Sequence, residues 1–241
     1  MVILVNGAVS AEETIMLKFY FHPSPNPLKA ALLIEELGIP YDLVPVDIFA
    51  GAQHAPAFRA INPNAKVPAI DDDGVVVFDS HAILLHLAEK HRRFVATKPV
   101  ERASMLSWLQ LVATGLSPFS GQAVHFLHYA PEVIPYAKNR YLKEVERHYR
   151  VLDERLAASA FLAGPEYGIA DMALWGWANS AGYVFGERGL AAYPNVQRVV
   201  QGIAQRPAAV RALKLKEGLT LKSAVDEETL RALFPQNVSA A

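Results

Sequence analysis

The first ninety residues alternate short apolar runs with polar turns, a pattern typical of a small mixed α/β domain. The aromatic run "LKFYF" (17–21) predicts a strand, and three prolines within five residues end it. In "LKAALLIEELG" (28–38) the apolar positions recur at helical spacing, and Gly38 is a suitable residue to follow the last turn. The chain therefore opens with a strand, a proline-rich turn and a helix.

Four further elements follow before residue 92, in the order strand, short helix, hairpin and helix. Their predicted ranges are 41–48, 55–62, 66–80 and 80–91. Either Asp79 or Ser80 is suited to cap the last of these helices. A βαβ unit, a short helix, a β-hairpin and a final helix form the order of a thioredoxin-like sheet, which we predict here.

From about residue 101 onward the pattern is helical throughout. The predicted helical segments are 101–116, 136–159, 168–184, 193–213 and 223–234. The segment 168–184 is almost entirely apolar, so we expect it at the buried centre of a second domain. A Ser-x-x-Asp pattern beginning at Ser223 predicts the start of the last helix.

These patterns predict an α/β plus all-α fold, in which a thioredoxin-like N-terminal domain precedes a C-terminal helical-bundle domain. The expected divisions are 1–15 as a leader or disordered extension, 16–94 as the thioredoxin-like domain, 95–104 as a linker, 105–222 as the all-α domain and 223–241 as a C-terminal extension with a short helix. The first of these lacks a basic residue ahead of its apolar stretch, so it is a poor signal peptide, and Met16 is a natural start.

Composition narrows the possible functions. The chain has 241 residues, 52% of them hydrophobic, which is enough to bury a core in one large or two small domains. A net charge of −1 gives no basic excess for nucleic acid or an anionic membrane, and no apolar run is long enough to span a bilayer. The absence of cysteine excludes disulfides, thiolate metal sites and a thiol nucleophile of the protein itself, and fits a cytoplasmic location.

The turn after the first strand is the natural reactive site of a thioredoxin-like domain. The N-terminus of the following helix favours an anion there, which thiol enzymes of this fold supply as a cysteine thiolate. Here the turn carries Ser24 and Asn26, so the anion has to come from a ligand. Both side chains can donate hydrogen bonds to a thiolate and lower its pKa, although Asn26 has no proton to titrate. The alternative is that both residues merely cap the helix.

Two other stretches offer places for a peptide-like ligand. Val67 precedes Pro68 at the start of a strand, which suggests that the bond between them is cis and that the Val67 backbone is free to pair with an extended ligand. The alternative is that Pro68 is an ordinary proline on an edge strand. Asp79 and Ser80 lie where a strand turns into a helix. Together they can hold an ammonium and a carboxylate, as the end of an α-amino acid requires, or they can form an ordinary N-cap pair.

These three stretches, in this order, resemble the glutathione transferase superfamily over residues 17–215. The turn is similar to the Thr-Pro-Asn-Gly pattern of the Nu class, the bacterial glutathione transferases with disulfide-bond reductase activity. The block "GQAVHFLHYAPEVIPYAKNRY" (121–141) resembles the signature of the same class and is far more specific than a Ser-Pro-Asn tripeptide.

The resemblance implies a role for individual residues. By this resemblance, Asn26 contacts the glutathione sulfur, with Ser24 in the place of the usual Thr, and Val67 pairs with the cysteinyl unit beside a cis Pro68. Gln53 and Lys66 approach the glycyl end of glutathione, while Asp79 and Ser80 hold its γ-glutamyl end. Arg140 reaches a second glutathione or the disulfide substrate. We also expect His125 and His128 to line the substrate side or to pack against the other domain.

Three residues depart from the family pattern. Pro27 replaces the Gly after Asn26 and removes a backbone donor from the first helical turn. His81 replaces a Gly and adds bulk and a titratable group beside the γ-glutamyl pocket. Gly168 stands where a Ser or Thr usually caps a helix with Asp171, so half of that capping box is missing.

Other kinds of site are not supported by the sequence. The eight histidines form no HExxH motif, and no carboxylate stands at a matching spacing, so we expect no metal site. Trp108, Trp175 and Trp177 lie in apolar helices, where core packing is the expected role. No glycine-rich phosphate loop follows a strand, which leaves nucleotide binding without support.

The resemblance implies an enzyme that uses glutathione as a cosubstrate and carries out glutathione-dependent disulfide reduction. Conjugation of glutathione to a small electrophile and peroxide reduction are alternatives within the same class. A non-catalytic, glutathione-binding regulatory protein is an alternative of another class. The resemblance also implies a homodimer, whereas the sequence leaves open the second substrate and whether one or two glutathiones bind.

Overall fold

A four-stranded mixed sheet forms the centre of the N-terminal half. The computed structural model describes residues 16–237, so the predicted leader 1–15 lies outside the described residues. The strands are β1 (Leu17–Phe21), β2 (Tyr41–Pro45), β3 (Ala69–Asp72) and β4 (Val75–Phe78), in the order β2-β1-β3-β4. β1 runs parallel to β2, and the other two pairs are antiparallel. The predicted parallel crossover and the later hairpin are both confirmed.

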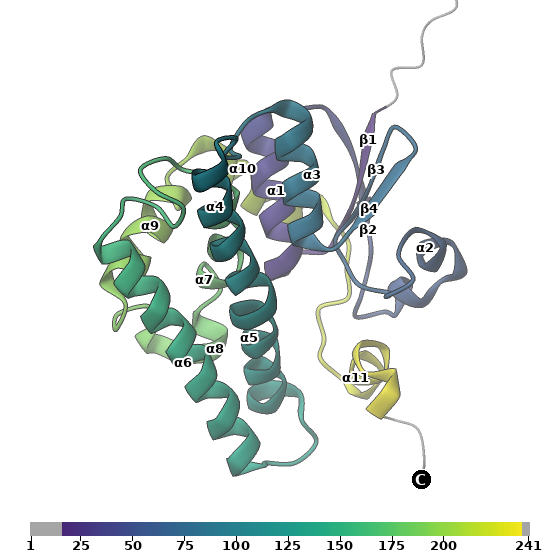
Figure 1. Ribbon diagram of the computed structural model, residues 1–241. Coiled ribbons are helices and arrows are strands. Elements are labelled where there is room, and N and C mark those ends of the chain that lie inside the picture. Colours follow the sequence, from purple (N-terminus) through teal and green to yellow (C-terminus); the bar gives the residue numbers. More distant parts are fainter. Residues whose placement is uncertain (1–15, 238–241) are drawn as a thin grey trace, which may run out of the picture.

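Helices cover both faces of this sheet (Figure 1). They are α1 (Pro25–Leu37), a 3₁₀ turn (Ala52–His54), α2 (Pro56–Ile61) and α3 (Ser80–His91). α1 and α3 lie side by side on one face, while α2 lies on the other. α1 ends at Gly38, whose φ of 69° is a left-handed conformation that glycine adopts without strain. The thioredoxin-like arrangement that the sequence predicts is confirmed.

The C-terminal half is helical. Its elements are α4 (Pro99–Leu111), α5 (Ser117–Val124), α6 (Pro135–Ala157), α7 (Ile169–Ala178), α8 (Gly182–Phe185), α9 (Pro194–Ala204), α10 (Pro207–Lys214) and α11 (Glu227–Leu233). Short π-helical turns at Val112–Leu116 and His125–Tyr129 flank α5, and 3₁₀ turns lie at Gly186–Arg188, Leu215–Gly218 and Pro235–Asn237. Every residue of α7 is buried, which confirms its predicted place at the centre of this domain. No helix between residues 16 and 237 combines the length and hydropathy of a membrane span.

Several predicted boundaries are wrong. The expected helix 193–213 is divided into α9 and α10, because Arg206 takes an extended conformation ahead of Pro207. The expected helix 168–184 ends at Ala178. α11 is capped by Asp226, whose carboxylate accepts from Thr229 N at 2.9 Å, so Ser223 is not its cap. α4 already begins at Pro99, which makes the second half of the expected linker 95–104 helical.

The two halves meet closely where α7 crosses α1. A Cβ atom on Gly176 would lie 2.5 Å from both Pro25 O and Lys29 Cγ, so only glycine permits this approach. Towards the other end of α1, Glu35 pairs with Arg211 and Glu36 with Arg206, both from the α10 region. The position of α7 against the first turn of α1 is therefore closely determined by packing.

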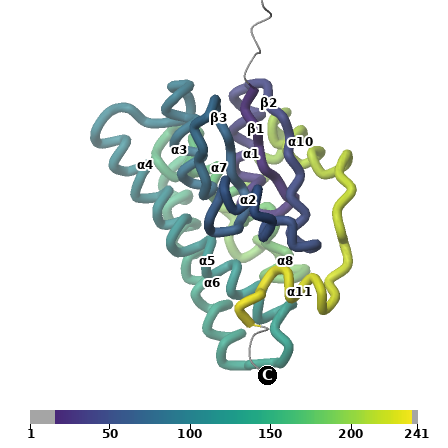
Figure 2. Tube along the Cα trace, turned by 90° about the vertical axis from the view of Figure 1, so that its right-hand side faces the viewer, coloured from purple at the N-terminus to yellow at the C-terminus, as the bar shows by residue number. Residues whose placement is uncertain are grey.

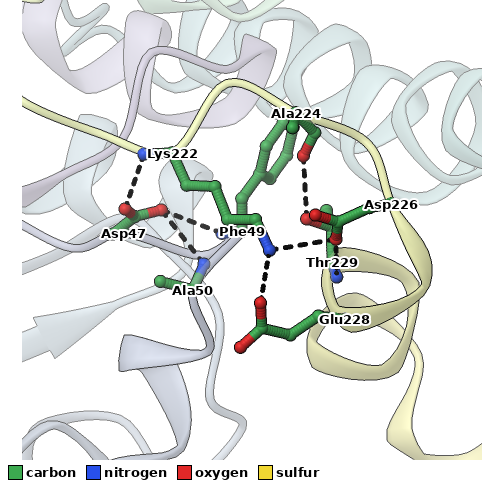
Figure 3. A network of polar contacts seen from close by, with 8 residues as sticks. All are labelled: Asp47, Phe49, Ala50, Lys222, Ala224, Asp226, Glu228 and Thr229. Atoms are coloured by element: carbon green, nitrogen blue, oxygen red, sulfur yellow. Dashed lines mark hydrogen bonds and ion pairs between the residues drawn. The ribbon is translucent and has the colours of Figure 1, made fainter.

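The C-terminal extension runs back from the helical domain to the thioredoxin-like domain (Figures 1 and 2). Figure 3 shows how it is attached: Lys222 N donates to Asp47 Oδ2 at 2.7 Å, and Lys222 Nζ pairs with Asp226 and Glu228. Thr229 Oγ1 donates to the carbonyl of Ala224. These bonds hold α11 beside the 3₁₀ turn at Ala52–His54.

Candidate functional site

The turn between β1 and α1 presents unpaired donors. α1 begins at Pro25, and Pro25 and Pro27 both lack an N–H, so Asn26 is the only residue of the first three helical positions with a backbone donor. No side chain caps the helix, and the Ser24 hydroxyl makes no hydrogen bond to any described residue. The alternative that Ser24 and Asn26 merely cap this helix is therefore wrong.

Asn26 is held by a residue from the other domain. The Trp177 indole donates from Nε1 to Asn26 Oδ1 at 3.2 Å, while Asn26 Nδ2 has no partner between residues 16 and 237. Core packing was expected for Trp177, which is only 9% exposed, so the expectation missed its contact with the site. Trp175 is fully buried as expected, whereas Trp108 is half-buried beneath the Arg155 guanidinium.

The Val67–Pro68 peptide is cis, as predicted. Pro68 precedes β3, which lies between β1 and β4, so the alternative of an ordinary proline on an edge strand is wrong. The ladder of β3 begins at Ala69, and the backbone N–H and C=O of Val67 form no hydrogen bond with the part of the chain that the structure describes. Val67 can therefore pair with an extended peptide by strand addition.

Asp79 and Ser80 lie at the start of α3. Asp79 Oδ1 accepts from His81 N at 2.8 Å and from Ala82 N at 3.3 Å, so the N-cap alternative describes this oxygen correctly. Oδ2 has no partner among the described residues, and the side chain is 65% exposed. Hydrogen bonds from His81 hold the pKa of Asp79 at about 2, which leaves a charged carboxylate oxygen open to an ammonium group.

His81 points into the protein, towards a buried lysine. Its Nε2 lies 3.4 Å from Lys29 Nζ, which also donates to Ser117 Oγ at 2.9 Å. Burial lowers the pKa of His81, and it lowers the pKa of Lys29 to about 7. Sequence reasoning missed Lys29, because a lone lysine in an amphipathic helix is ordinarily exposed. The departure at His81 thus forms part of a buried polar chain between α3, α1 and α5.

The two residues expected at the glycyl end of the ligand differ in their present partners. Gln53 is buried, and its Nε2 donates to Ile48 O at 3.2 Å and to Ala232 O at 2.9 Å. His54 Nε2 lies 2.8 Å from the same Ala232 oxygen, a contact that sequence reasoning missed. Lys66 is exposed, and its ammonium group forms no hydrogen bond or ion pair within residues 16–237, whereas its backbone oxygen accepts from Asn62 Nδ2 at 2.6 Å. The Nε2 group of Gln53 therefore already donates a hydrogen bond to the C-terminal extension.

The two histidines expected on the substrate side have different surroundings. The His125 ring lies 4.5 Å from that of Phe234 in the C-terminal extension, and burial lowers the pKa of His125. Phe234 also lies 5.8 Å from Tyr129. His128 is exposed, and its Nε2 lies 2.7 Å from the carbonyl oxygen of Tyr183. The extension thus bridges the two domains, from Gln53 on one side to His125 on the other.

Arg140 has no contact with the other candidate residues. It lies on α6, pairs with Glu144 at 2.8 Å and has a half-exposed side chain. No cluster of three or more His, Cys, Asp or Glu suited to a metal occurs in the described part of the chain. His22 is buried, with its ring 5.4 Å from that of Phe49. The site therefore offers three kinds of group: donors for an anion at Ser24 and Asn26, a free backbone for an extended peptide at Val67, and a carboxylate for an ammonium at Asp79.

Comparisons with known proteins agree with this chemistry. The family described as glutathione S-transferase, N-terminal domain, matches residues 23–90, and the corresponding C-terminal domain family matches residues 135–202. The chain is 44% identical over 205 residues to the disulfide-bond oxidoreductase YfcG of Escherichia coli, a match that covers 82% of this chain and 94% of that protein.

Two solved structures are similar over most of their length. A glutathione transferase from Burkholderia graminis, with two glutathione molecules bound per subunit, has a TM-score of 0.79 and 31% identity, covering 87% of this chain and 92% of that one. A glutathione transferase from Pseudomonas putida, with one glutathione disulfide bound per subunit, has the same score and identity, covering 86% and 94%.

Proposed function

Because the chain belongs to the glutathione S-transferase family, we propose that it is a glutathione-dependent enzyme that reduces disulfide bonds. One observation carries the proposal. A chain without cysteine presents the Ser24 hydroxyl and the Asn26 Nδ2 group at the N-terminus of α1, and neither has a partner among the described residues. In this family fold, such donors suit a thiolate that arrives with the substrate.

The proposed role of these donors is to keep glutathione ionised. A free thiol has a pKa of about 8.5, and a decrease of about one to two units leaves most of it as thiolate at neutral pH. Ser24 and Asn26 donate to the charged sulfur and stabilise it over the neutral thiol. The dipole of α1 acts in the same direction, although its prolines leave few free N–H groups.

The reaction then proceeds by thiol–disulfide exchange. The glutathione thiolate attacks one sulfur of the disulfide RS–SR′, which forms a mixed disulfide GS–SR and releases R′S⁻. A second glutathione thiolate attacks the glutathione sulfur of this mixed disulfide, giving glutathione disulfide and RS⁻. Both released thiolates take up protons, so two glutathiones supply the two electrons that reduce the substrate.

The remaining candidate residues bind the ends of glutathione in this proposal. The Val67 backbone pairs with the cysteinyl unit, and Asp79 Oδ2 with Ser80 holds the γ-glutamyl end. Lys66 and Gln53 hold the glycyl carboxylate, for which Gln53 has to exchange its bond to Ala232. Arg140, His125 and His128 act on the substrate side, towards a second glutathione or the disulfide.

We assign the chain to the Nu class and propose that two glutathiones bind in sequence. The block 121–141 supports the class, and the two glutathiones bound per subunit in the Burkholderia graminis structure support the stoichiometry. The divisions proposed above place glutathione in residues 16–94 and the second substrate against residues 105–222. A cytoplasmic location completes the proposal, supported by the absence of cysteine from the whole chain.

A turnover assay tests the function. With hydroxyethyl disulfide and excess glutathione, we expect turnover, measured by coupling the glutathione disulfide formed to NADPH oxidation. Replacing Asn26→Ala removes a hydrogen bond to a charged group and should lower kcat/KM about 10- to 100-fold. Asn139→Ala, on the exposed surface of α6, serves as the control and should retain full activity.

Two outcomes would contradict the proposal. Binding of glutathione in calorimetry without turnover of any disulfide would favour a regulatory protein of the same fold. Turnover with an electrophile or a peroxide but not with a disulfide would indicate conjugation or peroxide reduction instead.

A further inference from the structure

We infer that Trp177 is a positioning residue that decides which end of the Asn26 side chain faces the glutathione sulfur. The inference rests on the proposed function, because it assigns Trp177 a role only through the thiolate that Asn26 stabilises. It concerns one hydrogen bond that joins the helical domain to the reactive turn, from Trp177 Nε1 to Asn26 Oδ1 at 3.2 Å.

The chemistry of the two groups determines the orientation of the amide. An indole N–H only donates, so its partner on Asn26 has to be the carbonyl oxygen Oδ1. The opposite orientation would bring the Nδ2 donors against the indole donor and turn Oδ1 away from it. With Oδ1 held by Trp177, the free end of the amide is Nδ2, which is the end that can donate to a thiolate.

The fold holds the indole in this position. Gly176 lets α7 approach the first turn of α1 so closely that any Cβ there would meet Pro25 O at 2.5 Å. On the other side, a Cβ on Gly121 of α5 would lie 3.9 Å from the Trp177 ring, so α5 passes close to the ring there. Trp177 is 9% exposed, and water competes little for its N–H.

The bond also strengthens Asn26 as a donor. A hydrogen bond accepted by an amide oxygen polarises the whole amide, which makes its N–H groups better donors. Trp177 therefore acts in two ways through Asn26: it removes the unproductive orientation, and it increases the positive charge that Nδ2 presents to the sulfur. Both effects lower the pKa of bound glutathione, although Trp177 itself does not touch the thiolate.

The experiment compares two tryptophan variants on the same helix. Trp177→Phe keeps an aromatic ring and removes the donor, whereas Trp175→Phe alters a fully buried tryptophan whose Nε1 has no partner in the described structure. The readout is the thiol pKa of bound glutathione, titrated by the ultraviolet absorbance of the thiolate. Trp177→Phe should raise that pKa by about one unit. Trp175→Phe should leave it unchanged, whatever its effect on Tm.

Activity should follow the same titration. We expect Trp177→Phe to lower kcat/KM for disulfide reduction about tenfold below the new pKa and to recover as pH rises above it. A purely structural role would lower activity equally at every pH. In an Asn26→Ala background, Trp177→Phe should cause no further pKa shift, because the residue through which it acts is absent.

A second measurement does not depend on the folding of the tryptophan variants. In the wild-type protein and in Asn26→Ala, the indole N–H resonances are compared by NMR. Only that of Trp177 should shift, while those of Trp175 and Trp108 remain in place. An unchanged Trp177 resonance, or a Trp177→Phe protein with the wild-type thiol pKa, overturns the inference while the proposed function stands. A wild-type protein that neither binds glutathione nor reduces a disulfide overturns both.

Discussion

At the scale of single residues, Lys29 is a buried lysine whose hydrogen-bonding partners among the described residues include no carboxylate. Its side chain is fully buried where α1 meets the helical domain, yet its contacts are a serine hydroxyl and a neutral imidazole rather than a carboxylate. Burial disfavours the charged ammonium, which lowers the pKa of Lys29 to about 7, while Asp79 partly opposes this effect. The protein therefore holds a titratable group at neutral pH one turn away from Asn26.

This lysine should make stability depend on pH. Between about 7 and its ordinary pKa of 10.5, Lys29 keeps its proton in the unfolded state and loses it in the folded state. The unfolded state then binds more protons, so the free energy of unfolding rises with pH. We expect the difference between the wild type and Lys29→Met to change by about 2 kcal/mol from pH 7 to 9 in favour of the wild type.

Urea unfolding at several pH values measures this dependence. The range ends at pH 9 because burial raises the pKa of Tyr149 and Tyr167, so the free energy of unfolding of both proteins falls at higher pH. Lys214→Met, on the last turn of α10, is the control for removing a lysine charge. Parallel curves for the wild type and Lys29→Met would contradict the lowered pKa.

At the scale of elements, α7 is attached to the chain before it through one carboxylate. Asp171 is fully buried and accepts from Leu162 N at 2.8 Å and from Gly168 N at 3.0 Å. Gly168 has no side chain to return a hydrogen bond to Asp171. Only the Asp171 half of a capping box is therefore present, as the sequence predicts. Burial raises the pKa of Asp171 to about 6, although the backbone donors oppose this.

Replacing this carboxylate should be costly. Asp171→Ala leaves the two N–H groups without an acceptor, so we expect the free energy of unfolding to fall by about 3 kcal/mol. Asp171→Asn keeps one side-chain oxygen and should lose about half as much. Urea unfolding measures both, and equal losses for the two variants would show that the acceptor is not what stabilises this junction.

The C-terminal extension should compete with glutathione. Ala232 O occupies the donor of Gln53, so removing residues 219–241 frees that donor for the glycyl carboxylate. We expect calorimetry to show a Kd for glutathione lower by up to about tenfold, the worth of one hydrogen bond. Phe234→Ala keeps Ala232 but removes the ring beside His125, so it should leave this Kd unchanged. Weaker binding after truncation would mean that the extension supports the site.

At the scale of the whole molecule, β4 is an edge strand with exposed apolar side chains. Val75 is 53% exposed, Val76 43% and Phe78 42%, which is unusual for an edge open to water. Exposed apolar side chains on the edge of a sheet are typical of a contact surface between proteins. It supports the homodimer that the family resemblance implies.

A charge on this strand should weaken such a dimer. We expect light scattering to give twice the chain mass for the wild type and a larger monomer fraction for Phe78→Glu at the same concentration. Val210→Glu changes a similarly exposed residue on α10 and should leave the mass unchanged. A monomeric wild type would refute the homodimer without affecting the proposed chemistry.

Local chemistry determined a large part of this protein from the sequence alone. The first strand and α3 have the predicted limits, Gly38 ends α1, and the Val67–Pro68 peptide is cis. These features depend on neighbouring residues, because hydrophobic periodicity and the preferences of proline and glycine act over a few positions. The absence of cysteine and the turn with Ser24 and Asn26 can also be read directly from the sequence. They predicted that the reactive sulfur comes from a bound ligand.

Only the tertiary structure decided which distant groups meet around the candidate site. Trp177 reaches Asn26 across 151 positions, Lys29 is buried against Ser117, and Ala232 occupies Gln53. Each contact depends on how closely whole elements approach, as Gly176 shows for α7 and α1. Such an approach results from packing over many side chains at once, and no short stretch of sequence carries it.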